Sequence, residues 1–376
     1  MIKSLSVKGL NNRIDADLEF NEDLNIITGK NGSGKTTLLK LLWYLISGNL
    51  ARIISEIPFQ SVSITTDSFD LWVLKLEDDQ IKLFSTFAGE QQSIETGNVG
   101  QLDDKLKELS DRIAHTTERS FFFPTFRRIE GGFSGRDSRA GAQFSSFGDI
   151  EIVYPGRPIG RFADRATERL QEAMSQLSTG LSVDDHKFIA SISTRDIVAL
   201  LRAKHADISD ETDKLYVQLS KDITRKISET KGREAANSVL DDIQDRVEQV
   251  TQKREALFRP ISVLSERIKD FFQDKGIQVT QSITLGEAEE AIASDKLSAG
   301  EKQMLSFLCY NTFSEAVAIF IDEPELSLHV DWQRLLLPTL LEQETDNQFF
   351  IATHSPFIYS KYPDKEILLG DDRGDN

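Results

Sequence analysis

The chain has 376 residues, a formal net charge of −17 and a 39% content of hydrophobic residues. The acidic balance disfavours a surface that coats nucleic acid indiscriminately, and the hydrophobic content excludes a disordered chain. The single cysteine, Cys309, excludes an internal disulfide, and no apolar run approaches the about 20 residues that a membrane span needs. Because the N-terminus is strand-like and lacks the features of a signal peptide, we expect a cytoplasmic protein with no membrane partner.

Alternation of apolar and polar residues predicts a series of short strands at hairpin spacing in the first part of the chain. These strands are expected over residues 2–7, 14–20, 24–27, 61–65, 71–76 and 80–87. The third strand leads directly into a glycine-rich segment, and helical periodicity follows that segment. A strand, a glycine-rich loop and a helix in this order are typical of a phosphate-binding loop in an α/β sheet.

The glycine-rich segment matches the pattern G-x-x-x-x-G-K-[ST]. Its residues, with the next residue of the helix, are Gly29, Lys30, Asn31, Gly32, Ser33, Gly34, Lys35, Thr36 and Thr37. Glycines let backbone N–H groups surround phosphates, and the positive end of the following helix points at them. We expect Lys35 to contact the β- and γ-phosphates of ATP and the Thr36 hydroxyl to ligate Mg²⁺. The segment therefore predicts ATP and Mg²⁺ as cofactors.

An aromatic-dense stretch, Ser120 to Glu130, leads into a segment in which arginine is the only basic residue. From Arg119 to Arg169 there are nine arginines and six acidic residues, which gives +3 against −20 for the rest of the chain. Salt bridges around a buried aromatic strand would explain this composition. A DNA-contact strip and a dock for an acidic partner are the alternatives, because arginine suits both phosphate and carboxylate. Residues 131–146 are expected to form a mobile loop.

From about Ala163 to Gln273 glycine is sparse, charge is dense and the periodicity is helical. Apolar residues recur there at alternating spacings of three and four, which is a short heptad stripe, and Pro260 is expected to kink or end its helix. The stripe comprises Ile243, Val247, Val250, Leu257, Ile261, Leu264 and Ile268. Two interpretations stay open: a helical hairpin packed on itself, and an arm that binds a partner or dimerises.

An apolar strand over residues 318–321 ends on two carboxylates, Asp322 and Glu323. Ligands gather at the carboxyl ends of strands in α/β sheets. Asp322 would hold Mg²⁺ directly or through water, and Glu323 would orient and deprotonate an attacking water. A buried strand that merely ends on acidic residues is the alternative, which the phosphate loop upstream disfavours.

Two further segments accompany this acidic strand. Lys296 to Met304 opens a helix before it, with Ser298 suited to the N-cap and Glu301 three residues on, a capping box. The segment could therefore simply start a helix, but its spacing to the acidic strand favours a functional role. Ile351 to Pro356 forms a later strand that ends near His354.

Together these motifs resemble those of the ABC ATPase superfamily. Leu297 to Gln303 is similar to the signature motif in the LSxGE form, Glu325 to His329 to the D-loop, and His354 to the switch histidine that touches the γ-phosphate. In that superfamily two heads sandwich two ATP molecules. The resemblance implies that Ser298 and Gly300 of one head contact the phosphate bound by the other, so that the chain forms at least a head dimer.

The resemblance also implies the fold: an α/β ABC-ATPase head with a mixed sheet around the phosphate loop, an antiparallel β lobe and an inserted helical arm. Residues 1–160 and 277–376 would form the two parts of the head, and residues 161–276 the arm. The Q-loop glutamine of the superfamily is not placed. Gln60 is a candidate only through its position before a strand.

The segments IDEPELSLHVDWQ and ATHSPF are similar to those in the ATPase domain of the overcoming-lysogenisation-defect (OLD) nucleases and their relatives. Those relatives include ATPases of two-gene prokaryotic antiphage systems. OLD nucleases carry a Toprim nuclease domain after the histidine motif, which we expect this chain to lack. The expected function is an ATP-hydrolysing regulatory subunit of a defence system that controls a separate effector such as a nuclease. The alternatives are a RecF/SMC-like ATPase acting on DNA, and a scaffold with structural ATP sites, which Glu323 disfavours.

Overall fold

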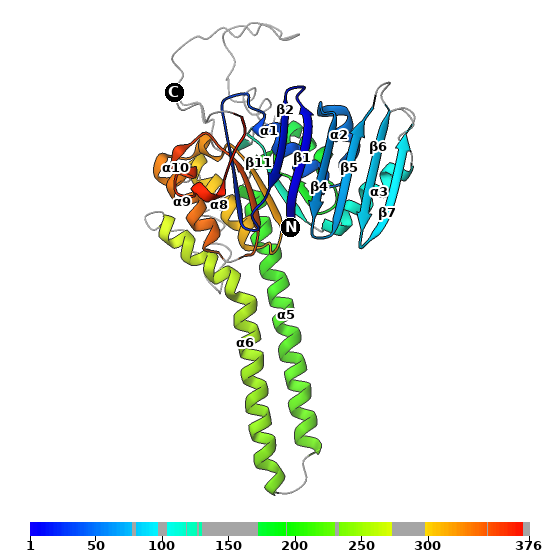
Figure 1. Cartoon of the computed structure of the whole chain (residues 1–376). Helices are drawn as coiled ribbons and strands as arrows, with labels where there is room; N and C mark the ends of the chain where they lie inside the picture. The colour runs from blue at the N-terminus through cyan, green and yellow to red at the C-terminus, as the bar shows by residue number, and fades with distance from the viewer. Residues whose placement is uncertain are drawn as a thin grey trace, which may run out of the picture.

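The computed structural model describes residues 1–76, 80–96, 104–117, 119–125, 128–129, 172–192, 194–229, 233–272, 298–343 and 345–370. These residues form a head with two six-stranded sheets and a short two-stranded one, from which a pair of long helices projects (Figure 1). Lys296 and Leu297 of the signature motif, the predicted loop 131–146 and most of the arginine-rich segment lie outside the described residues. None of the helices in the described ranges combines the length and the apolar character that a membrane span requires.

One sheet is antiparallel, with the strand order β2-β1-β4-β5-β6-β7. Its strands are β1 (Ile2–Leu10), β2 (Ile14–Glu19), β4 (Ser61–Thr66), β5 (Phe69–Lys75), β6 (Ile81–Phe87) and β7 (Glu90–Thr96). Burial alternates along β4, β5 and β6, because one face of the sheet packs on the core and the other faces solvent. The strands predicted from alternation in this part of the chain are confirmed. The one over residues 24–27 is β3 of the second sheet, and the others lie in the antiparallel lobe.

The other sheet has the strand order β10-β8-β12-β13-β3-β14. Its strands are β3 (Leu24–Thr28), β8 (Ser120–Phe123), β10 (His186–Phe188), β12 (Ala318–Asp322), β13 (Gln348–Ala352) and β14 (Glu366–Leu368). A mixed sheet was expected here, but all of its described pairs are parallel. The predicted α/β class is confirmed. β3, β8 and β13 are buried along their whole length, as strands covered on both faces are.

Helix α1 (Lys35–Ile46), which starts at the end of the phosphate loop, packs in the core between the two sheets. Its buried side chains share one hydrophobic cluster with Phe122, Phe320 and Phe350 of the parallel sheet and with the inner face of the antiparallel sheet. The rings of Phe320 and Phe350 stack with centroids 4.9 Å apart. Helices α2 (Leu50–Glu56) and α3 (Asp104–Thr117) join the same cluster. Each large side chain buried here contributes about 1.5–3 kcal/mol, so this layer fixes the start of α1 and the loop before it.

The second face of the parallel sheet is covered by α8 (Ala299–Thr312) and α9 (Val330–Leu341). Side chains that alternate with those of the first cluster, such as Phe123 and Ile321, pack on this side. Cys309 of α8 is fully buried among them, and burial raises the pKa of its thiol, as a core cysteine should show. Other described elements of the head include the short strands β9 (Arg128–Ile129) and β11 (Ser191–Ile192), which pair in parallel, the short helix α10 (Pro356–Tyr359), and the 3₁₀ helices η4 (Pro324–Ser327) and η5 (Pro363–Lys365).

The arm is a pair of long helices, α5 (Thr194–Glu229) and α6 (Arg233–Phe272), which lie side by side and extend away from the head (Figure 1). Near the head their apolar side chains, including Leu201 and Leu264, enter the second hydrophobic cluster. Farther out, Lys226 Nζ and Asp242 Oδ2 form an ion pair at 2.7 Å. The two helices are thus anchored at one end by the core of the head.

The predicted heptad stripe is buried only in part. Val250, Ile261 and Leu264 are buried, whereas Val247 is 42% exposed. Pro260 does not end α6, which continues to Phe272, and the ribbon of α6 changes direction where it approaches the head (Figure 1). Strand β10, which precedes the arm in the chain, pairs with β8 in the sheet of the head.

Candidate nucleotide-binding site

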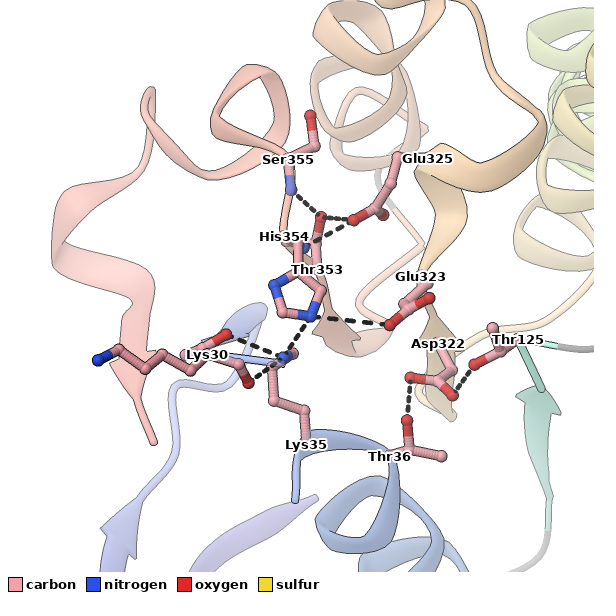
Figure 2. A network of polar contacts seen from close by, with 11 residues as sticks. Lys30, Lys35, Thr36, Thr125, Asp322, Glu323, Glu325, Thr353, His354 and Ser355 are labelled. Atoms are coloured by element: carbon pink, nitrogen blue, oxygen red, sulfur yellow. Dashed lines mark hydrogen bonds and ion pairs between the residues drawn. The ribbon is translucent and has the colours of Figure 1, made fainter. Parts of the chain in front are cut away.

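Four neighbouring strands of the parallel sheet deliver polar residues to one edge. β3 leads into the phosphate loop, and Thr125 follows β8. β12 ends at Asp322, just before Glu323, and His354 follows β13. Since β8, β12, β13 and β3 are adjacent in the sheet, their carboxyl ends bring together residues that are far apart in the sequence. Figure 2 shows the resulting network of polar contacts.

The phosphate loop is closed around the side chain of Lys35. Lys35 Nζ donates hydrogen bonds to the carbonyl oxygens of Gly29 at 2.9 Å and Lys30 at 3.1 Å. Three glycines of the loop have positive φ, where an L side chain would be strained: Gly29, Gly32 and Gly34. Ser33 Oγ is buried in the loop and has no hydrogen-bond partner among the described residues. A buried hydroxyl without a partner is unfavourable, so the loop fits a phosphate group that would supply one.

Lys35 is only 5% exposed, and burial lowers the pKa of its ammonium group. The carboxylates of Glu323, Asp322 and Glu325 oppose this shift. An anion bound in the loop would add to their effect, because a nearby negative charge favours the charged amine. A phosphate bound in the loop would thus help to keep Lys35 charged.

His354 and Glu323 face Lys35 from the ends of β13 and β12. His354 Nε2 lies 2.6 Å from Lys35 Nζ and 3.8 Å from Glu323 Oε1. A charged lysine only donates, so His354 accepts through Nε2 and carries its proton on Nδ1 in this arrangement. Glu323 has a left-handed backbone, with φ 45° and ψ 64°, and its N–H donates to Ala352 O at 2.8 Å. Such a conformation is uncommon for a residue other than glycine, and at this position it belongs to a polar site.

Asp322 is fully buried and is held by two hydroxyl groups. Its Oδ1 accepts from Thr36 Oγ1 at 3.1 Å, and its Oδ2 accepts from Thr125 Oγ1. A hydroxyl and a carboxylate are the oxygen ligands that Mg²⁺ takes, usually while it keeps several waters and contacts substrate phosphates. Among the described residues, no group of three or more His, Cys, Asp or Glu side chains could hold a metal ion. Thr36 and Asp322 therefore fit a Mg²⁺ ion whose other ligands are phosphate and water.

The signature helix α8 begins as the sequence predicts. Ser298 Oγ accepts from Glu301 N at 3.3 Å, and Glu301 Oε2 accepts from Ser298 N at 2.6 Å, which confirms the capping box. Gly300 has a packing role within the head, because a Cβ at this position would lie 2.4 Å from the carbonyl oxygen of Ser327. Ser298 is exposed, and no contact described here joins it to the network around Lys35. Among the described residues, these contacts bring together Lys35, Thr36, Asp322, Glu323 and His354, and Ser298 and Gly300 lie outside this network.

Several contacts of the site could not be found from the motifs alone. Thr125 follows the strand next to β12, which is the one signal that could have placed it. The turn between β1 and β2 also reaches the phosphate loop: Asn11 Nδ2 donates to Thr37 Oγ1 at 3.2 Å, and the Arg13 guanidinium donates to Gly32 O. The Q-loop candidate Gln60 packs instead beside Gly9 of β1, where a Cβ would lie 2.8 Å from Gln60 Cγ.

A parallel sheet with a phosphate loop, an acidic strand end and a facing histidine defines a P-loop nucleotide-binding protein. Residues 24–360 match the family described as "AAA domain, putative AbiEii toxin, Type IV TA system", and the chain belongs to that family. It is an ATPase of the AAA/ABC-like type.

Named relatives agree with this assignment. The chain is 21% identical over 379 residues to the "Retron Vc95 probable ATPase" of Vibrio cholerae serotype O1 biovar El Tor, an alignment that covers 93% of this chain and 69% of that protein. It is 28% identical over 179 residues to "Endonuclease GajA" of Bacillus cereus (strain VD045), covering 42% of this chain and 30% of the endonuclease. A shorter similarity, 38% over 55 residues and 15% of each chain, links it to the "DNA replication and repair protein RecF" of Desulfitobacterium hafniense (strain DSM 10664 / DCB-2).

Proposed function

We propose that this chain hydrolyses ATP in a pair of heads and uses the ATP state to hold or release an effector protein, such as a nuclease, in prokaryotic antiphage defence. The observation that carries the ATPase chemistry is the convergence of Lys35, Glu323 and His354 beside the Thr36–Asp322 pair. The defence role is supported by the similarity to a retron ATPase, which extends over 93% of this chain.

The geometry supports direct attack of water on the γ-phosphate. Lys35 would hold the β- and γ-phosphates, and the carboxylate of Glu323 would take a proton from the water as it bonds to the γ-phosphorus. The bond from that phosphorus to the bridging oxygen then breaks, giving ADP and phosphate. Thr36 and Asp322 would hold Mg²⁺, which neutralises charge on the phosphate oxygens when it is bound.

His354 must change its bonding when ATP binds. Its Nε2 accepts from Lys35 in the arrangement described above, whereas a phosphate oxygen requires a donor. We therefore expect the ring to present an N–H to the γ-phosphate, while Lys35 turns its own donors to the phosphates. This exchange would make the position of His354 sensitive to the nucleotide.

The exposed start of α8 supports a composite site. Ser298 caps a helix of 14 residues, and the positive end of such a helix favours a phosphate. Ser298 lies outside the network of its own head, so the phosphate it contacts would be the one bound by a second copy. Gly300 would act in the same interface while it keeps α8 close to η4.

A mixing experiment tests the composite site. Lys35→Ala destroys the phosphate loop but leaves a signature helix, and Ser298→Arg does the reverse. Each variant alone should lose hydrolysis, and an equal mixture should regain part of it, because one of the two sites in a mixed pair is intact. Melting temperatures of both variants check folding, since loss of an N-cap costs about 1 kcal/mol. Parental hydrolysis by Ser298→Arg, or no recovery in the mixture, would contradict action in trans.

A RecF/SMC-like ATPase that acts on DNA is the second candidate function, and the similarity to RecF favours it. The two functions differ in their response to DNA. A DNA clamp should show hydrolysis stimulated by DNA and binding that weakens steeply with salt, because phosphate contacts release counterions. A defence regulator should instead bind a protein effector in one nucleotide state and release it in the other. Titration of ATPase activity with duplex DNA at two salt concentrations separates them.

A further inference from the structure

The loop that carries His354 is bonded to a carboxylate from a different segment. Glu325 Oε1, in the 3₁₀ helix η4, accepts from the backbone N–H of His354 at 2.7 Å and from Thr353 Oγ1 at 2.9 Å. Figure 2 shows Glu325 on the side of this loop away from Lys35. The next residue is held as well, since Ser355 Oγ donates to Gln333 Oε1 of α9 at 2.6 Å. The backbone of His354 is thus hydrogen-bonded to Glu325, and the adjacent residues Thr353 and Ser355 are hydrogen-bonded to Glu325 and Gln333.

The segment that carries Glu325 is itself anchored at both ends. Gln303 of α8 is fully buried and donates through Nε2 to Pro324 O at 2.9 Å. Gln333 Nε2 donates to Leu328 O at 2.8 Å. Glu325 is therefore held in place relative to α8 and α9. Through its hydrogen bonds it restrains the loop after β13.

The two carboxylate oxygens of Glu325 have different environments. Oε1 accepts both hydrogen bonds, whereas Oε2 is buried and has no hydrogen-bond partner among the described residues. Only one oxygen of this side chain is thus used to hold the loop. A side chain that keeps this oxygen and replaces the other should keep the loop in place.

We propose that Glu325 is a positioning residue for ATP hydrolysis. Its carboxylate holds the N–H of His354 and the hydroxyl of Thr353, and thereby keeps the imidazole between Lys35 and Glu323. Glu325 acts through the loop and not on the nucleotide, so it should affect the rate of the chemical step more than the binding of ATP. Misplacement of a catalytic group by about 1 Å can lower a rate about 10²-fold. This inference rests on the role proposed above for His354.

Steady-state hydrolysis by the full chain tests the inference with two substitutions. Glu325→Ala removes the acceptor, and we expect kcat to fall about 10- to 100-fold while KM for ATP stays within about twofold. Glu325→Gln keeps an acceptor oxygen and replaces only the oxygen that has no partner, so it should recover most of kcat. Glu108→Ala, on the exposed face of α3, is the matched control and should hydrolyse at the parental rate. Equal losses in the alanine and glutamine variants would overturn the inference.

A double-mutant cycle distinguishes positioning from a general structural role. If Glu325 acts through His354, Glu325→Ala should slow the His354→Ala variant no further. A further loss as large as that in the parental background would overturn the inference. A slow His354→Ala variant together with a parental rate in Glu325→Ala would overturn this inference alone. A parental rate in His354→Ala would overturn both it and the proposed role of His354.

Discussion

The edge of the parallel sheet and the outer part of the arm are held together in different ways. At the sheet edge, Asp322 is fully buried and accepts a hydrogen bond from Thr36, while Lys35 is 5% exposed and donates to the carbonyl oxygen of Gly29. In the outer arm the links between α5 and α6 include the exposed ion pair of Lys226 and Asp242, and apolar side chains such as Leu240 remain 63% exposed. The polar atoms of the sheet edge are thus buried and bonded, whereas the outer arm exposes both charged and apolar side chains.

This difference separates two tasks within one chain. Phosphoryl transfer depends mainly on positioning and electrostatics, so its residues must be held by many contacts. A surface that contacts another protein needs exposed side chains and tolerates changes more readily. We expect substitutions at the sheet edge to abolish activity, and substitutions in the outer arm to leave both activity and stability almost unchanged.

The largest effect is expected at Lys35. Lys35→Ala removes the ammonium group that the phosphate loop surrounds, so ATP binding should be lost and hydrolysis should fall about 10²- to 10³-fold or more. Binding of a fluorescent ATP analogue and release of phosphate measure the two effects. Lys107→Ala, an exposed residue on α3, is the control and should behave as the parental chain. Retained affinity in Lys35→Ala would show that the loop is not the phosphate site.

A smaller effect is expected where α8 meets η4. Gly300→Ala would place a Cβ 2.4 Å from Ser327 O, so the helix must shift, and we expect a loss of about 1–3 kcal/mol in the free energy of unfolding. Gly180→Ala is the matched control, because nothing lies within 4 Å of its Cβ position. Urea unfolding of both variants measures the difference. Equal stability of the two would mean that Gly300 serves only a partner contact.

The stability of the head should also depend on pH through His186. This histidine is fully buried between β8 and α3, where Nδ1 lies 2.7 Å from Ser120 Oγ and Nε2 lies 3.0 Å from Ala114 O. Burial lowers its pKa below the ordinary value of 6.5. As the pH falls below about 6.5, the unfolded chain takes up a proton that the folded chain does not, so folding stability decreases.

Thermal unfolding at pH 7.5 and 5.5 measures this dependence. The parental melting temperature should fall between these values by more than that of His186→Asn, which cannot titrate there. The same change in both proteins would assign the pH dependence to other groups.

The smallest effect is expected in the outer arm. Asp242→Ala removes the ion pair with Lys226, whose side chains are 55% and 36% exposed, and exposed pairs contribute about 0–1 kcal/mol. Melting temperature and hydrolysis should both stay close to the parental values. A loss of hydrolysis comparable with that of a sheet-edge variant would show that the outer arm is coupled to the nucleotide site and does not tolerate change.

Much of the site could be predicted because each motif follows a strand. Lys35, Asp322 and His354 come after β3, at the end of β12 and after β13, and parallel neighbours must bring their carboxyl ends to the same edge. The strands of the antiparallel lobe could also be predicted, because one buried face imposes an alternation of apolar and polar residues on them. Local sequence patterns therefore predict both the strands and the strand ends that carry the site residues.

Other features depend on contacts between segments that no local pattern connects. Glu325 bonds to residues 28 and 29 positions later, and Thr125 bonds to Asp322, 197 positions later. A buried polar cluster at the end of α8, where Asn311 bonds to Gln343 and Asn347, likewise breaks the apolar pattern of a core. Such pairs become visible only when the strands and helices have been placed in three dimensions.

The most direct test of the ATPase mechanism is Glu323→Gln. The amide keeps the shape of the side chain but cannot accept the proton of the attacking water, so hydrolysis should fall about 10²- to 10⁴-fold while ATP stays bound. Single-turnover hydrolysis, together with light scattering in the presence of ATP and Mg²⁺, measures both the chemistry and the pairing of heads. We expect ATP to stay bound and a dimer of heads to be trapped. Hydrolysis at the parental rate by Glu323→Gln would show that Glu323 is not the general base.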